Sequence, residues 1–202
     1  MHRGNVYNSY QISILMSINV FIIHGTGGNP NGNWFPWLKK ELEKLNYKVF
    51  IPKFPTPKDQ NLDNWLKILN NHNKDIDENT IFIGHSLGSA FILDYLERSS
   101  KKIKSAYLIA GFIGFLNNKH FDDLNGSFTN KDFNWDKIMK NCSKFYIISS
   151  DNDPYVPLAK GKELANKLDS NLILIKNAGH INSDSGFIKF DFLLDKISKK
   201  LQ

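Results

Sequence analysis

The sequence has 202 residues, of which 41% are hydrophobic and 23% are charged, and it contains 15 Phe, four Trp and seven Tyr. This length fits one domain, and the composition excludes an intrinsically disordered chain, which requires low hydrophobicity. The formal net charge is +6, but the 26 Lys and Arg residues alternate with acids, as in 39–44 (KKELEK). This pattern indicates solvated helix faces, so we expect no nucleic-acid partner.

Other features of the sequence concern the subcellular location of the protein and the start of its folded domain. The single cysteine, Cys142, cannot form an intrachain disulfide, which favours a reducing, cytoplasmic location. No run approaches the roughly 20 apolar residues of a membrane span, and the stretch before Met16 lacks a signal-peptide cleavage site. Because Met16 leads directly into a predicted buried strand, we expect 1–15 to be a disordered extension or an upstream start. Residues 16–202 are then a single domain.

The hydrophobic pattern predicts an alternation of strands and helices from residue 18 onward. Short β-branched runs predict buried strands at 18–23, 48–51, 79–84, 103–110, 144–149 and 171–176. Apolar residues at helical spacing predict helices at 34–45, 62–69, 87–98, 158–168 and 187–201. In the last helix we expect an inward face of Ile188, Phe192, Leu193 and Ile197. This order predicts an α/β fold in which helices cover both faces of a mostly parallel sheet of about six strands.

Residues 111–143 interrupt this alternation. They contain five Phe and one Trp, with little periodicity after Gly114. A loop of this length and composition is typical of a lid or a pocket wall, and it is equally compatible with a loop packed on the core. The sequence leaves both interpretations open.

The strongest chemical signal is the G-x-S-x-G motif at 84–88 (GHSLG), between a predicted strand and a predicted helix. Gly84 and Gly88 permit a sharp turn at His85-Ser86 that lifts the serine hydroxyl to the carboxyl edge of the sheet. Ser86 is therefore the candidate nucleophile. The alternative is a serine that caps a helix beside two packing glycines.

A serine nucleophile needs a base, and the base needs an acid that orients it. His180 is the candidate base because it lies in a loop directly after the last predicted strand. After the fifth strand, Asp153 lies in a loop stiffened by prolines and is the preferred acid, whereas Asp151 is the reserve and is better suited to bracing the turn. The chain order Ser86, Asp153, His180 is the order of α/β-hydrolases.

The oxyanion of an acyl-transfer transition state needs two backbone N–H donors. We expect one from Leu87 and the other from Thr26, in a glycine-rich loop that lacks the patterns of phosphate-binding loops.

For the substrate pocket, the expected lining residues are aromatic or imidazole side chains: His24, Trp34, Phe112 and Trp135. Each of these four is equally compatible with ordinary core packing.

The chain resembles the small serine hydrolases of the retinoblastoma-binding-protein type in four segments: HGTGGNPNGNW, IFIGHSLGS, SSDNDPYVP and NAGHIN. The resemblance runs from about Ile18 to the C-terminus, and residues 1–15 have no counterpart. It implies an α/β-hydrolase fold without a separate cap domain and a triad of Ser86, Asp153 and His180. It also implies hydrolysis of small carboxylic esters, with peptidase-like activity on aromatic aminoacyl compounds in some members.

These features predict an enzyme, an esterase rather than a peptidase, that cleaves small-molecule esters with short or medium acyl chains. We expect no cofactor, no metal and no membrane partner. An aminopeptidase or amidase would need an acidic residue in the pocket, for which Asp122, Asp123 and Asp132 are candidates. A protein-binding module on a hydrolase scaffold is the alternative from another functional class.

Overall fold

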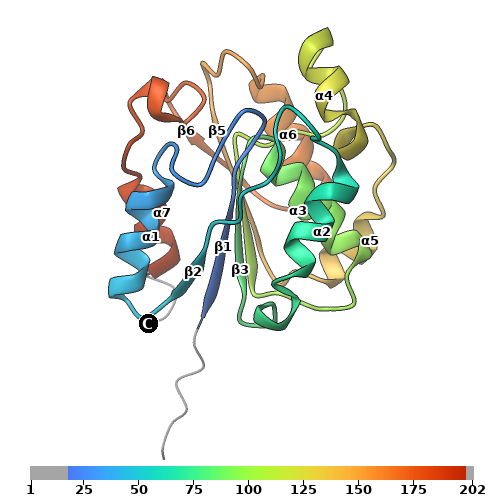
Figure 1. Cartoon of the computed structure of the whole chain (residues 1–202). Helices are drawn as coiled ribbons and strands as arrows, with labels where there is room; N and C mark the ends of the chain where they lie inside the picture. The colour runs from blue at the N-terminus through green and yellow to red at the C-terminus, as the bar shows by residue number, and fades with distance from the viewer. Residues whose placement is uncertain (1–17, 199–202) are drawn as a thin grey trace, which may run out of the picture.

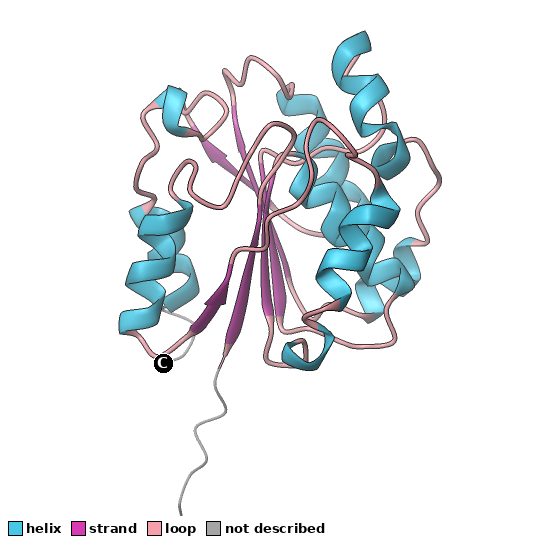
Figure 2. Cartoon of the chain, viewed as in Figure 1, coloured by secondary structure: helices cyan, strands magenta, loops and turns pink. Residues whose placement is uncertain are grey.

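A six-stranded sheet forms the middle layer of the computed structural model, which describes residues 18–198 (Figures 1 and 2). The predicted extension at 1–15 lies outside the described residues. The strands are β1 (Asn19–Ile23), β2 (Lys48–Phe50), β3 (Ile81–His85), β4 (Ser105–Ile109), β5 (Phe145–Ser150) and β6 (Leu172–Ile175). Their order is β2-β1-β3-β4-β5-β6, and every neighbouring pair is parallel, so the predicted sheet is confirmed.

Helices cover both faces of this sheet. They are α1 (Phe35–Lys44), α2 (Leu62–Asn70), α3 (Leu87–Arg98), α4 (Lys119–Thr129), α5 (Trp135–Lys140), α6 (Leu158–Lys167) and α7 (Asp191–Ser198). The helices α1 and α7 lie on one face, and α2, α3, α5 and α6 lie on the other (Figure 1). Between residues 18 and 198, no helix is long and apolar enough to cross a membrane.

Alternate residues of the central strands enter two separate cores. Phe21 and Phe82 pack beneath α2 and α3, whereas Ile22 and Ile83 pack beneath α1 and α7. Both faces of the sheet are therefore buried, which explains why these strands have continuous apolar runs instead of alternating polar residues. Trp65 of α2 is fully buried and stacks on Phe54 with ring centroids 4.6 Å apart.

The irregular stretch predicted at 111–143 contains two helices, α4 and α5. Asn118 caps α4 by accepting a hydrogen bond from the backbone N–H of Phe121, and Asn134 caps α5 in the same way. Phe128 and Ile138 are buried in the core beside α3, which stabilises helices whose polar composition conceals their periodicity. The prediction of a long irregular loop was wrong for this reason.

The closing helix begins at Asp191, not at Phe187. A short 3-10 helix, η2 (Ser183–Ser185), precedes it and ends at Gly186, which has a left-handed backbone with φ 86°. Only part of the expected inward face is correct, because Leu193 and Ile197 are buried whereas Ile188 is 64% exposed and Phe192 is 38% exposed. The missing first turn places Ile188 outside the helix, so its side chain does not follow the helical period.

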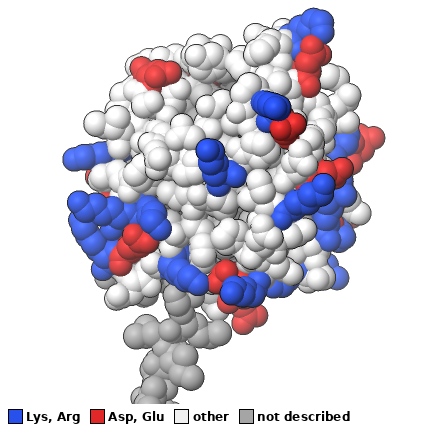
Figure 3. All heavy atoms as spheres, in the orientation of Figure 1, with Lys and Arg blue, Asp and Glu red and all other residues white. Residues whose placement is uncertain are grey.

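Lysine and arginine side chains are scattered over the face in Figure 3, where several lie beside Asp or Glu. Ion pairs such as Lys39–Glu43 and Lys119–Asp123 join residues four apart on a helix. These pairs contribute little to stability, but they match the expected solvated faces. No continuous basic stripe crosses this view.

Backbone atoms of β1, β3 and α3 meet directly at two glycines. A Cβ built on Gly84 would lie 2.7 Å from the carbonyl carbon of Gly88, and one built on Gly88 would lie 2.4 Å from the carbonyl oxygen of Ile23. Real side chains do not tolerate such distances. The turn between β3 and α3 therefore depends on glycine at both positions.

We expect Gly88→Ala to lower the free energy of unfolding by about 1–3 kcal/mol, because the added methyl group must displace backbone. The matched control is Gly126→Ala in α4, where an added Cβ meets nothing within 4 Å. This control should raise stability by roughly 0.5–1 kcal/mol through helix propensity. Thermal unfolding followed by circular dichroism measures both changes, and equal melting temperatures for the two variants would contradict the assigned contact.

Candidate active site

Ser86 lies at the tip of the turn between β3 and α3 with φ 54° and ψ −122°. A positive φ is strained for a residue with a side chain, and here the packing of the neighbouring glycines maintains it. The Ser86 side chain makes no capping hydrogen bond to α3. The alternative of a helix-capping serine therefore does not fit, and the hydroxyl is free to take part in other contacts.

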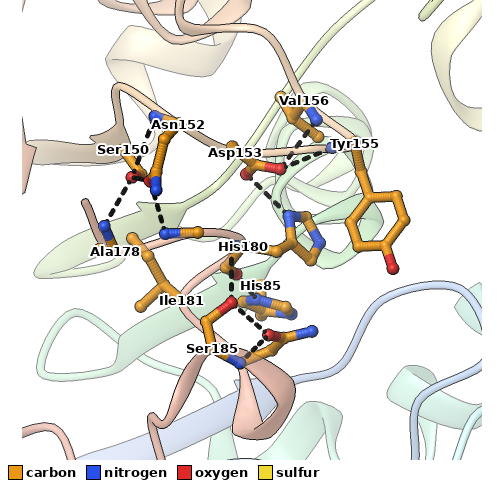
Figure 4. A network of polar contacts seen from close by, with 12 residues as sticks. His85, Ser150, Asn152, Asp153, Tyr155, Val156, Ala178, His180, Ile181 and Ser185 are labelled. Carbon is orange, nitrogen blue, oxygen red and sulfur yellow. Dashed lines mark hydrogen bonds and ion pairs between the residues drawn. The ribbon is translucent and has the colours of Figure 1, made fainter. Parts of the chain in front are cut away.

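His180 and Asp153 come from separate loops and form a short contact (Figure 4). The Nδ1 atom of His180 lies 2.7 Å from Oδ2 of Asp153, and the two side chains are only 10% and 2% exposed. The other carboxylate oxygen, Oδ1, accepts hydrogen bonds from the backbone N–H groups of Tyr155 at 2.8 Å and Val156 at 3.0 Å. Because a carboxylate can only accept, Nδ1 carries the proton and Nε2 is left unprotonated in the neutral ring.

Three side chains at the end of β5 and in the loop after it hold the loop that carries His180. Ser150, Asp151 and Asn152 accept hydrogen bonds from the backbone N–H groups of three consecutive residues at 177–179, at distances of 2.7–3.0 Å. Asp151, the reserve acid, therefore braces the turn and does not contact the His180 ring. This connection fixes the spacing between the acid loop and the histidine loop (Figure 4).

His85 supports His180 from below. Its Nε2 atom lies 2.9 Å from the backbone oxygen of His180, and the two rings are 4.8 Å apart. Burial, together with the neighbouring His180 ring, lowers the pKa of His85 to about 3. The His85 ring is therefore neutral at physiological pH and donates Nε2–H to the carbonyl. Sequence reasoning placed His85 in the turn but did not predict its contact with His180.

Ser86 and His180 line one pocket of about 310 Å3. Within residues 18–198 no hydrogen bond joins the serine hydroxyl to the His180 ring; such contacts often close only when substrate binds. The complete lining is Gly25, Thr26, Gly27, Gly28, Asn33, His85, Ser86, Phe112, Leu116, Phe121, Asn125, Tyr155, Val156, His180, Asn182, Ser183 and Asp184. The structure thus brings the predicted nucleophile, base and acid to the same edge of the sheet.

The loop after β1 touches the serine turn through its backbone. A Cβ on Gly25 would lie 2.8 Å from Cβ of Ser86 and 3.3 Å from the backbone nitrogen of Leu87. Thr26 lines the pocket, and the backbone N–H groups of Thr26 and Leu87 have no hydrogen-bond acceptor within residues 18–198. Their assignment as oxyanion donors stays a prediction that this arrangement allows.

Only Phe112 of the four expected pocket residues lines the pocket; His24, Trp34 and Trp135 do not. His24 is fully buried, where its Nδ1 lies 2.9 Å from the Gly25 oxygen and its Nε2 accepts from Phe54 N. This burial lowers the pKa of His24, so its ring stays neutral. Trp34 is also fully buried and donates Nε1–H to the Ile181 oxygen. Both rings are buried, and their ring nitrogens form hydrogen bonds with backbone groups.

Trp135 lies at the start of α5, where its ring is 5.3 Å from that of Phe133 and packs against the core.

The acidic candidates for binding a substrate amine also lie outside the pocket lining. Asp122 accepts from the backbone N–H groups of Leu116 and Asn118, and Asp123 pairs with Lys119. None of the three predicted aspartates lines the pocket.

Sequence reasoning missed several side chains of the pocket wall, among them Phe121, Asn125, Tyr155 and Asp184. Tyr155 follows Asp153 by two residues, and its ring lies 5.1 Å from His180 and 5.9 Å from Phe121. Proximity to the predicted acid and base could have identified Tyr155 and Asp184. By contrast, Phe121 and Asn125 share a face only because 119–129 is helical, so finding them required the helix α4.

Comparison with known proteins shows that the chain belongs to the serine hydrolase family. The family model described as serine hydrolase matches residues 20–199. YdeN of Bacillus subtilis (strain 168) is 33% identical over 191 residues, which cover 92% of this chain and 99% of YdeN. Serine hydrolase RBBP9 of Rattus norvegicus is 27% identical over 165 residues, which cover 80% of this chain and 86% of RBBP9.

Solved structures share the fold. The crystal structure of the ydeN gene product from B. subtilis matches with a TM-score of 0.85 at 30% identity, covering 91% of this chain and 98% of that chain. The α/β hydrolase MGS-MChE2, from a lagoon-sediment metagenome, matches with a TM-score of 0.68 at 18% identity, covering 91% of both chains. At that identity the second match concerns the fold alone. The sheet and its helices therefore form an α/β-hydrolase fold.

Because His85 is buried in its neutral form, we expect the free energy of unfolding to depend on pH. Its pKa of about 3 in the folded state lies below the usual 6.5, so only the unfolded chain gains this proton as the pH falls below 6.5. The contribution of the neutral His85 ring to the free energy of unfolding is therefore fully present above pH 6.5, and it is lost progressively as the pH falls toward 3. We expect His85→Gln to reduce the loss of stability between pH 7.5 and pH 5 by about 2 kcal/mol.

Urea unfolding of wild type and variant at the two pH values measures this difference. His120→Gln is the matched control, because His120 is an exposed residue of α4. The control should retain the wild-type pH dependence. An equal dependence in His85→Gln would contradict the buried neutral ring.

Proposed function

Because this chain belongs to the serine hydrolase family, we propose that it hydrolyses small carboxylic esters through an acyl-Ser86 intermediate. The observation that carries this proposal is the 2.7 Å contact between His180 Nδ1 and Asp153 Oδ2 beside a pocket that Ser86 lines. That contact orients the imidazole and leaves Nε2 as the free base. A buried, oriented histidine beside a strained serine is the arrangement that acyl transfer requires.

The proposed reaction has two half-reactions. Ser86 Oγ attacks the acyl carbonyl while His180 Nε2 takes the hydroxyl proton, and the backbone N–H groups of Thr26 and Leu87 stabilise the oxyanion. The C–O bond to the alcohol breaks, and His180 gives its proton to the departing oxygen. Water then attacks the acyl-serine, His180 takes a proton from that water, and the proton returns to Ser86 as the acid leaves. Asp153 stays ionised throughout.

The pocket supports a small substrate. Its volume of about 310 Å3 is at the lower end of the usual range for ligand sites. One wall is apolar and comprises Phe112, Leu116, Phe121 and Val156. This wall suits a short or medium acyl chain, because a longer chain would extend beyond the lined volume.

A second candidate, hydrolysis of aminoacyl esters or amides, is favoured by Asp184, which lines the same pocket. A carboxylate in the pocket lining could pair with a substrate ammonium group. Faster turnover of aminoacyl p-nitroanilides than of p-nitrophenyl esters would support this candidate over the first.

We expect a fluorophosphonate probe to label the wild-type protein and to leave Ser86→Ala unlabelled, because labelling requires an activated serine. Hydrolysis of p-nitrophenyl esters by Ser86→Ala should fall by about 10³-fold or more. Ser143→Ala, which removes an exposed serine away from the pocket, is the matched control and should keep both activities. If the folded wild type is not labelled, a protein-binding module becomes the better interpretation.

A further inference from the structure

The carboxamide of Asn125 lies on the pocket wall with one end held by other side chains. Asn125 belongs to α4, which rises beyond the carboxyl edge of the sheet (Figure 1), and the residue is only 2% exposed. Its Oδ1 accepts a hydrogen bond from Thr26 Oγ1 at 2.6 Å and another from Gln60 Nε2 at 3.0 Å. Three segments distant in the sequence therefore meet at this oxygen.

The partners of Gln60 fix which end of the Asn125 carboxamide is the oxygen. Gln60 Nε2 lies 3.0 Å from the backbone oxygen of Leu124, which can only accept, so this end of Gln60 is its nitrogen. The same nitrogen faces Asn125, whose facing atom must then be an acceptor. At the other end, Gln60 Oε1 accepts from Thr56 Oγ1, which itself accepts from the backbone N–H of Gly27. Each of these hydrogen bonds therefore joins one donor to one acceptor when Oδ1 of Asn125 faces Gln60.

The other end of the carboxamide, Nδ2, has no acceptor within residues 18–198. It is also not among the buried side-chain atoms that lack a partner, so it keeps access to the pocket that Asn125 lines. The Nδ2 amino group is therefore the end of the carboxamide left free for a ligand in this pocket, and the hydrogen bonds to Oδ1 fix its orientation. A fixed donor that a ligand buries must find an acceptor, because an unpaired buried donor is unfavourable.

The surroundings of this donor define the acceptor. Phe121 lies one helical turn before Asn125 and lines the pocket with Phe112 and Leu116, so the neighbouring wall is apolar. Such a wall disfavours a charged group and suits a neutral oxygen within an apolar chain. Thr26 connects the donor directly to the loop that contacts Ser86 through Gly25, so the acceptor lies near the reacting carbonyl.

We infer that Asn125 is a specificity-determining residue, which selects esters with a neutral acceptor oxygen in the acyl or alcohol chain near the scissile bond. This inference rests on the proposed esterase function. Gln60 is the positioning residue, because it acts only by holding Oδ1 of Asn125 away from the substrate. An ester with a methylene in place of that oxygen leaves the carboxamide donor unpaired and is disfavoured.

Two series of matched esters test this selection. One series replaces single methylenes, from C3 of the acyl chain of p-nitrophenyl hexanoate onward, by ether oxygens, and the other does the same from C3 of the alcohol chain of a hexyl ester onward. Each kcat/KM is divided by the rate constant for alkaline hydrolysis of the same ester, which removes intrinsic reactivity. In the wild type, we expect an oxygen at one position to raise this quotient at least tenfold over the all-carbon ester.

Asn125→Asp keeps an oxygen for Thr26 and Gln60 but replaces the pocket-facing donor by an acceptor, so the tenfold preference should fall to one or below. Asn166→Asp introduces the same charge at an exposed position of α6 and should keep the wild-type preference. Both esters are measured on one protein sample. A variant that merely loses stability therefore cannot change their ratio.

If Asn125→Asp does not fold, Gln60→Met removes the donor that orients Asn125, and the preference should again fall. A wild-type preference near one at every position, or an unchanged preference in these variants, would overturn this inference while ester hydrolysis and Ser86-dependent labelling stand. Absence of hydrolysis for every ester, with no labelling, would instead overturn the proposed function and this inference with it.

Discussion

Direct backbone contact at the turn between β3 and α3 is the constraint on which the site depends. Gly84 allows α3 to pack closely on β3, Gly88 allows α3 to touch β1, and Gly25 allows the loop after β1 to touch Ser86 itself. Side chains at these positions would push the three segments apart. The strained conformation of Ser86 persists because segments on several sides determine it, and its hydroxyl is thereby kept at the carboxyl edge of the sheet.

Neutral buried rings hold the other half of the site. His85 donates to the backbone of His180, and Trp34 donates to the backbone of Ile181, so two buried aromatic side chains support the loop that carries the base. An uncharged ring is important at this position for the proposed reaction, because a cation beside His180 would oppose the positive charge that its ring acquires there. The carboxylate of Asp153, held by two backbone N–H groups, favours that charge from the other side.

One part of the pocket wall is built by α4, which lies apart in the sequence from Ser86, Asp153 and His180. This helix contributes an apolar ring from Phe121 and an oriented carboxamide from Asn125, and a network through Gln60 and Thr26 connects it to the loop beside Ser86. In the proposed function, chemistry and selectivity are thereby assigned to different elements. The turn after β3 is constrained by backbone packing, whereas α4 contributes side chains to the pocket.

The sequence by itself determined the parallel sheet, five of the helices and the order of Ser86, Asp153 and His180, because buried strands and glycine turns leave local patterns. The carboxyl ends of parallel strands share one edge, so residues just after three strands were expected to approach one another. Tertiary structure alone decided that 119–129 and 135–140 are helical, since Phe128 and Ile138 are stabilised by distant partners. It also decided that His24 and Trp34 enter the core whereas Phe121 and Asn125 line the pocket, because burial depends on neighbours remote in the chain.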